Sequence, residues 1–238
     1  MENLSYLQWL VKHTATTWWH DSGDPDEFAF GRSHGATGVT TNPVLTSQAL
    51  HGQPEYWTTH VEPLDENQSP EEKVETLMRS VACPLARQLE STHTSTGGAQ
   101  GYVCAQVNPA EASQREVMLA TAQKFHTWAP NIAVKLPVTA AGLDVLEECV
   151  AQGITVTATV SFTVPQVIAI AERHRKGAAR ARQSGIIPGH CFAVIMIGRI
   201  DDYLRDVAID QNAAVSEADI RCAGLAISKR AYRIFQAN

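Results

Sequence analysis

Apolar segments rich in β-branched residues recur along the chain, and a longer stretch with helical spacing of its apolar positions follows each of them. This alternation is typical of βα units around a parallel sheet. The pattern predicts an α/β fold with six strands, each ending in polar or special residues. The expected strand ranges are 16–20, 38–41, 101–107, 132–136, 154–160 and 191–197.

Helices are expected after these strands, and several begin with proline, whose missing N–H costs little in a first helical turn. The expected helix ranges are 43–50, 70–90, 109–128, 140–152, 163–176, 199–209 and 216–235. Residues 91–100 and 177–189 are expected to be loops. Neither loop has the character of a domain boundary, so we expect a single domain over residues 1–238.

The chain is moderately acidic. Its 238 residues carry a formal net charge of -6, which leaves no global basic field for a nucleic acid or an anionic membrane surface. No run approaches the ~20 apolar residues that span a bilayer. We expect a small-molecule partner, no nucleic acid and no membrane, so that local charges must bind any anionic ligand.

The five cysteines lie far apart and show no CxxC spacing. This pattern fits reduced thiols better than disulfides or a zinc site, and it favours a cytoplasmic location. The nine histidines show no HxH or HxxxH pairing, and the sequence contains no GxGxxG or GxxxxGKS/T loop. We therefore expect no metal and no nucleotide cofactor.

Polar residues stand at the ends of the expected strands. The carboxyl ends of parallel strands face one mouth of a barrel, so such residues converge although they lie far apart in sequence. The candidates are Asp21, Thr41, Asn42, Gln106, Lys135, Thr157, Thr159 and Arg199.

Lys135 is the most informative of these candidates because it lies inside an otherwise apolar strand pattern. Burial disfavours the charged form of an amine and leaves a neutral nucleophile for a ketone carbonyl. The alternative is a lysine at a strand edge whose side chain reaches solvent. The strand pattern by itself leaves both interpretations open.

Three motifs then follow one another: GVTTNP at 38–43, VKLPVT at 134–139 with Gly142 and Leu143, and GRIDD at 198–202. In this order they resemble the signatures of the transaldolase family, which includes long transaldolases and a shorter branch with fructose-6-phosphate aldolase and sulfosugar transaldolases. Residues 223–232 are similar to a helix that some members carry after the sixth strand. The resemblance covers most of the chain.

The resemblance implies a parallel (β/α) TIM-type barrel. Family members have eight strands and six are evident here, so we expect an incomplete barrel without the last two βα units. Three explanations stay open: the two missing strands lie in segments assigned to loops, the sequence is a fragment of a longer chain, or another chain completes the sheet. The family commonly forms dimers or rings, and we expect a homo-oligomer.

The implied activity is transfer of a dihydroxyacetone unit from an anionic ketose, either a sugar phosphate or a sulfosugar, to an aldehyde acceptor. Lys135 matches the Schiff-base lysine and Asp21 the acid/base aspartate, with Asp24 as a rival. Asn42 matches a residue that binds substrate hydroxyls, and it is also a candidate helix cap. The other candidates are Thr159 for the catalytic water, Arg199 for the substrate's anionic end, and Thr41, Thr157 and Ser161 for substrate binding.

Several positions depart from the family pattern. Gln106 stands where ordinary transaldolases have a water-activating glutamate, and a glutamine orients water without removing its proton. The short aldolase branch also has glutamine there, but it has a tyrosine where this chain has Phe162. Val194 replaces a serine that helps bind phosphate. The basic residues of the segment 173–182 either compensate for that loss or form a solvated helix face.

Two alternatives to the transferase stay open. One is a lyase of the fructose-6-phosphate aldolase type, which releases dihydroxyacetone. The other is a truncated or degenerate member that binds a sugar phosphate without catalysis, because fold does not guarantee activity.

Overall fold

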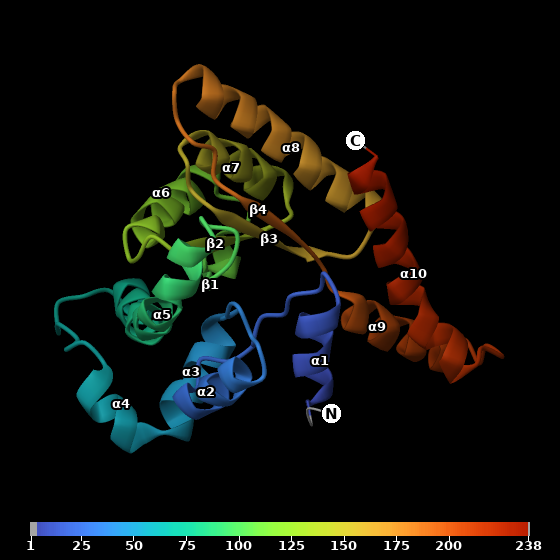
Figure 1. Cartoon of the computed structure of the whole chain (residues 1–238), viewed down its shortest axis with the longest axis horizontal. Helices are drawn as coiled ribbons and strands as arrows, with labels where there is room; N and C mark the ends of the chain where they lie inside the picture. The colour runs from blue at the N-terminus through green and yellow to red at the C-terminus, as the bar shows by residue number, and fades with distance from the viewer. Residues whose placement is uncertain (1–3, 238) are drawn as a thin grey trace. The chain divides into compact units, whose positions relative to one another are not determined.

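The computed structural model describes residues 4–237, which divide into two compact units. The first unit runs to Gln106 and takes in Lys124–Val134. The second takes Val107–Gln123 and the described residues from Lys135 onward. Figure 1 gives the order and labels of the helices and strands, and each unit is described by itself.

Helices make up most of the first unit. They are α1 (Tyr6–His13), α2 (Pro25–Ser33), α3 (Pro43–Gly52), α4 (Pro54–His60) and α5 (Pro70–Ser95), and β1 (Val103–Gln106) follows them. Four of the five begin at proline, as expected for a residue without an N–H. The sequence pattern did not predict α1, α2 and α4, which are only 7 to 9 residues long.

The remaining elements complete the alternation of strands and helices. They are η1 (Pro109–Glu111), α6 (Arg115–His126), β2 (Ile132–Pro137), α7 (Ala140–Ala151), β3 (Val156–Ser161), α8 (Val164–Gln183), β4 (Cys191–Ile195), α9 (Ile197–Asp210) and α10 (Glu217–Gln236). The boundary between the units falls within α6 and within β2.

The four strands form one parallel sheet with the order β1-β2-β3-β4. Chain order equals spatial order, which is the arrangement that successive βα crossovers produce. The expected α/β fold is therefore confirmed.

The first two expected strands are much shorter than predicted. His20 and Val39 form one parallel bridge, and Val39 and Val103 form another. Backbone bonds such as His20 N–H to Gly38 O (2.9 Å) and Thr40 N–H to His20 O (2.8 Å) keep the segments side by side. Residues 16 and 17 are exposed, so no burial extends this pairing into a strand.

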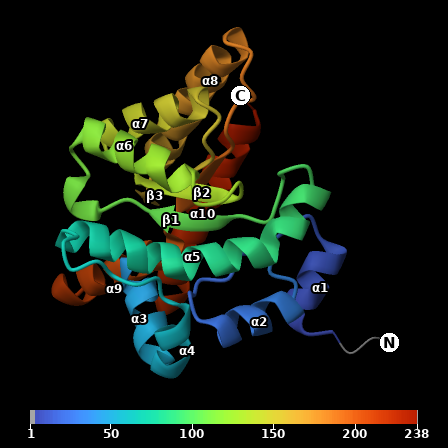
Figure 2. The same cartoon turned by 90° about the vertical axis from the view of Figure 1, so that its left-hand side faces the viewer.

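In the first unit α5 packs along β1 (Figure 2). Val81, Leu85 and Leu89 of this helix are fully or almost fully buried. The buried Asn131 side chain donates to the carbonyls of Ala86 (2.9 Å) and Gly101 (2.7 Å), which ties the helix to the start of the strand. Both bonds come from the Asn131 NH₂ group, whereas the buried amide oxygen Oδ1 accepts no hydrogen bond from the residues that the structure describes.

In the second unit α7 and α8 lie side by side (Figure 1). A Cβ atom at Gly177 would lie 2.4 Å from the Glu147 carbonyl, so glycine permits this close approach. The expected loop over residues 177–189 is therefore partly wrong, because α8 continues through Gly177 to Gln183. Likewise α5 continues to Ser95 before Gly97 and Gly98 end it with positive φ angles.

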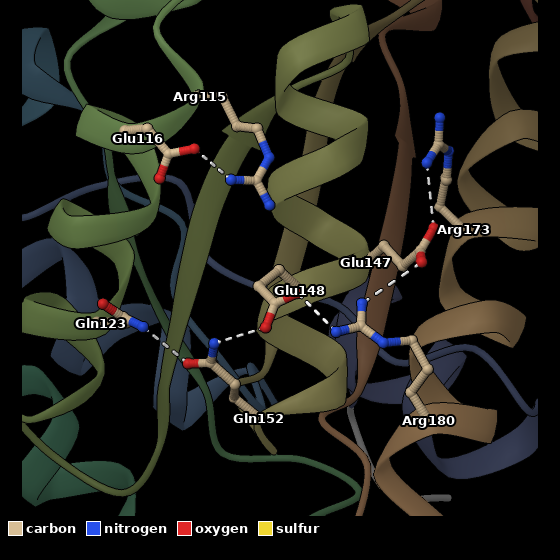
Figure 3. A network of polar contacts seen from close by, with 8 residues as sticks. All are labelled: Arg115, Glu116, Gln123, Glu147, Glu148, Gln152, Arg173 and Arg180. Carbon is tan, nitrogen blue, oxygen red and sulfur yellow. Dashed lines mark hydrogen bonds and ion pairs between the residues drawn. The ribbon is translucent and has the colours of Figure 1, made fainter.

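Two arginines of α8, Arg173 and Arg180, face acidic residues of α7 (Figure 3). Arg173 Nη1 lies 2.8 Å from Asp144 and 3.1 Å from Glu147, and Arg180 Nη2 lies 2.8 Å from Glu148. Arg173 and Arg180 thus have structural partners on a helix face. Hydrogen bonds from Gln152 (2.8 Å) and Arg180 to Glu148 lower the pKa of that carboxyl.

Within residues 4–237 no helix combines the length and the apolar character that a membrane span requires. Within the described residues, none of the five cysteines forms a disulfide bond.

We predict that Glu148→Gln reduces the stability of the second unit at neutral pH by about 1 kcal/mol, since networked surface ion pairs contribute little more. A carboxyl whose folded-state pKa is lowered stabilises the fold above its unfolded pKa, and this contribution disappears as the pH falls through the folded value. The loss of Tm between about pH 7 and about pH 3 should therefore be smaller in Glu148→Gln than in the wild type. Thermal unfolding at several pH values measures this difference, and Glu172→Gln, which changes an exposed glutamate of α8, is the control. An equal dependence of Tm on pH in Glu148→Gln and the wild type would contradict the prediction.

Candidate active site

Lys135 occupies the middle of β2, between the buried Val134 and Leu136, and is itself half-buried. Side chains alternate between the two faces of a strand, so Lys135 shares its face with Ala133 and Pro137. The expectation of a lysine inside a buried strand therefore agrees with its position.

The end of β2 lies beside the end of β3. The Val138 N–H donates to the Thr159 carbonyl at 2.9 Å. In a parallel ladder this bond sets residue 138 opposite residue 160, so the end of β2 that carries Lys135 lies beside the end of β3 that carries Thr157 and Thr159. Both threonines, at 157 and 159, are buried. The structure thus brings the lysine and two hydroxyl groups onto neighbouring strands.

Ser161 is oriented differently from the threonines before it. Ala158 pairs with Ala193, but Ser161 pairs with Ile195, so β3 contains an extra residue between these pairs. The bulge puts Ser161 on the face of Ala158 and away from that of Thr157. Its hydroxyl donates to the Val194 carbonyl, so the expected substrate-binding hydroxyl has a structural partner.

Arg199 lies in the first turn of α9 and is exposed. A helix start of this kind presents backbone N–H groups and a positive dipole end, which favour a nearby anion. Val194 in β4 offers no side-chain hydroxyl. The structure therefore provides a guanidinium and a helix start for an anionic group in the second unit.

Asp21 directly follows the bridge residue His20 in the first unit, and it accepts a hydrogen bond from the Thr40 hydroxyl. The rival Asp24 caps α2 by accepting from the N–H groups of Asp26 (2.9 Å) and Glu27 (3.0 Å). The cap gives Asp24 a structural task. This difference supports Asp21 as the candidate acid/base group.

Thr41 and Asn42 both support the fold. The Thr41 hydroxyl is buried and donates to the Cys104 carbonyl at 2.7 Å. The Asn42 side-chain oxygen accepts from the Leu45 N–H at 2.9 Å and caps α3. The cap uses the carbonyl oxygen of the amide, so a second role for its NH₂ group is compatible with the first.

Gln106 is the last residue of β1 and is half-buried. The structure places Asp21, Thr41, Asn42 and Gln106 in the first unit and Lys135, Thr157, Thr159, Ser161 and Arg199 in the second. Phe162 follows β3, where its N–H donates to the Gln166 side chain at 2.9 Å.

Other nucleophiles and ligand sets are weaker candidates. Burial raises the pKa of the Cys191 thiol to about 12, so this thiol in β4 stays protonated at neutral pH. In the part of the chain that the structure describes, no three His, Cys, Asp or Glu side chains gather as a metal site would require.

The sequence pattern did not predict the turn that follows Lys135. The Thr139 hydroxyl accepts from the Gly142 N–H (3.0 Å), which caps α7, and it donates to the Ala112 carbonyl (2.7 Å). A Cβ atom at Gly142 would lie 1.9 Å from the Pro137 carbonyl oxygen. The sequence signal for this turn is Thr139, which lies three residues before Gly142.

We predict that Gly142→Ala lowers the free energy of unfolding by about 2–3 kcal/mol, because overpacking against a backbone atom outweighs the better helix propensity of alanine. Urea denaturation measures the loss. Gly198→Ala is the matched control in the first turn of α9, since nothing lies within 4 Å of its added methyl group. Equal stability of Gly142→Ala and wild type would show that α7 does not depend on this contact.

Comparison with known proteins adds independent evidence. The profile of the family described as Transaldolase/Fructose-6-phosphate aldolase matches residues 18–238. A transaldolase of Neisseria gonorrhoeae is 29% identical over 182 residues, which are 75% of this chain and 52% of that protein. Transaldolase 1 of Streptomyces avermitilis is 26% identical over 204 residues, covering 84% and 54%. The chain spans about half the length of the curated relatives it matches.

Proposed function

Since the chain belongs to the transaldolase/fructose-6-phosphate aldolase family, we propose that it transfers a dihydroxyacetone unit from an anionic ketose to an aldehyde through a Schiff base. The observation that carries this proposal is Lys135, a half-buried amine in β2, a strand whose end lies beside the end of β3 that carries Thr157 and Thr159. A primary amine at this position is a nucleophile that can form a Schiff base with a ketone.

The first half of the proposed reaction forms and uses an iminium ion. The Lys135 amine adds to the ketone carbonyl, and loss of water leaves a C=N⁺ bond. Asp21 takes the proton of the neighbouring hydroxyl as the C–C bond breaks, so that the aldehyde leaves and the electron pair becomes an enamine.

The second half runs in the opposite direction with a new aldehyde. The enamine carbon attacks the acceptor, and Asp21 returns the proton to the new hydroxyl. Water then adds to the iminium carbon and releases the product and the lysine. Thr159 and Gln106 orient this water, and Asp21 takes its proton, since an amide cannot.

The substrate's anionic end is proposed to bind at Arg199 and the start of α9. A guanidinium forms a planar, bidentate pair with phosphate and with sulfonate alike. Val194 has no hydroxyl group to donate to a phosphate. We therefore propose both sugar phosphates and sulfosugars as substrates. Arg173 and Arg180 are engaged with α7 and are not part of this site.

Gln106 favours a second candidate, a lyase that releases dihydroxyacetone. The two reactions share every step up to the enamine and differ in whether a proton or an aldehyde captures it. We also propose that the protein is cytoplasmic and that it forms a homo-oligomer.

We predict that borohydride reduction in the presence of fructose 6-phosphate or sulfofructose attaches a dihydroxyacetone-sized adduct to Lys135, because hydride reduces the iminium irreversibly. Intact and peptide mass spectrometry locates the adduct. Lys135→Met should abolish it, whereas Lys176→Met, which removes an exposed lysine of α8, should leave it unchanged. An adduct on another lysine, or no adduct with either ketose, would refute the Schiff-base proposal.

The two roles of Asn42 can be separated by substitution. Asn42→Ser retains a capping oxygen, so its stability should stay close to that of the wild type, while Asn42→Ala should lose about 1 kcal/mol. Both variants lack the amide NH₂ group, so both should need at least about tenfold more ketose for half-maximal trapping. Trapping by Asn42→Ser at wild-type concentrations would reduce Asn42 to a helix cap.

A further inference from the structure

Two paired segments of the first unit bring the side chains of Asp21 and Thr40 together. His20 forms a parallel bridge with Val39, so the next residues along the two segments stand level with each other on one face. The His20 carbonyl accepts from the Thr40 N–H at 2.8 Å, which fixes this register. The Thr40 hydroxyl then donates to Oδ1 of the Asp21 carboxylate.

The hydroxyl of the next threonine has different surroundings. Thr41 is buried and donates to the Cys104 carbonyl at 2.7 Å, so its hydroxyl joins two segments of the fold. Thr40 is only half-buried, and the Asp21 side chain that it contacts belongs to an exposed residue. A hydrogen bond at such a place contributes little to stability, because water competes for both groups. Its main effect is to restrict the rotation of the carboxylate.

The bond engages one of the two carboxylate oxygens. It uses Oδ1 and leaves Oδ2 outside the contact with Thr40. A general base must aim a lone pair at the proton that it takes. Because the two oxygens share a plane, a bond that holds Oδ1 also sets the direction of the lone pairs on Oδ2.

We propose that Thr40 is a positioning residue, whose hydroxyl orients Asp21 so that Oδ2 takes the hydroxyl proton of the ketose bound at Lys135. This inference rests on the function proposed above. In that step the proton passes from the ketose hydroxyl to Oδ2, the aldehyde leaves, and the electron pair of the broken C–C bond becomes the enamine. Thr40 takes no proton itself and acts through the direction of the carboxylate.

The test uses the mass of the adduct that borohydride traps from fructose 6-phosphate. Reduction before C–C cleavage attaches the whole ketose phosphate, and reduction after cleavage attaches a dihydroxyacetone-sized unit. Thr40→Val removes the hydroxyl at nearly constant shape, and Thr40→Ser retains a hydroxyl. The control is Thr37→Val, because Oγ1 of Thr37 is buried and has no hydrogen-bond partner among the described residues.

Thr40→Val should form the whole-ketose adduct at the wild-type rate and the dihydroxyacetone-sized adduct at least about tenfold more slowly, because a misaligned base slows the cleavage step. Thr40→Ser should restore the wild-type ratio of the two adducts, and Thr37→Val should leave that ratio unchanged. In an Asp21→Asn background Thr40→Val should cause no further fall, because it acts through the carboxylate. A loss of folded protein would instead lower both adducts together.

Three results would overturn the inference while the proposed function stands. If Thr40→Val gives the wild-type ratio of adducts, Thr40 does not position Asp21. If both adducts fall together, the role of Thr40 is structural. If Thr40→Ser loses as much as Thr40→Val, the hydroxyl is not the group that matters. Failure of the wild type to form a dihydroxyacetone-sized adduct on Lys135 would instead refute the proposed function, and this inference with it.

Discussion

A lysine inside a buried parallel strand is the constraint on which the rest of the structure depends. Burying an amine costs free energy unless the surroundings supply partners. The neighbouring segments must therefore hold β2 in position. The Val138 bond to Thr159 joins it to β3, and the turn at Thr139 and Gly142 fixes the helix that follows. Of the residues that hold the strand in place, Thr159 also has a role in the proposed chemistry.

Polar residues at the strand ends serve the fold first. Asp24 and Asn42 cap helices, Thr41 binds a strand carbonyl, and Ser161 is turned by the bulge toward Val194. These bonds give Asp24 and Ser161 structural partners, and the substrate-binding role of Ser161 stays a prediction. The roles of Asp21, Thr159 and Arg199 in the proposed chemistry of Lys135 stay predictions.

The sequence predicted the order of the parallel segments and the strand position of Lys135 because hydrophobic burial sets both. It did not predict α1, whose residues are not buried, because short exposed helices leave little periodic signal. Gly177 was assigned to a loop because glycine usually ends helices, yet here it permits the contact of α7 with α8. The bulge at Val160, whose φ angle is 61°, could not be foreseen, since no residue that favours a left-handed backbone marks it.

The most direct test of the central claim is a crystal structure of the protein after borohydride reduction with fructose 6-phosphate. We expect continuous electron density from Lys135 Nζ to the second carbon of the trapped unit, with the Asp21 carboxylate and the Thr159 hydroxyl within hydrogen-bond distance of its oxygens. Density on a different side chain, or an Asp21 carboxylate remote from the trapped unit, would contradict the proposed mechanism.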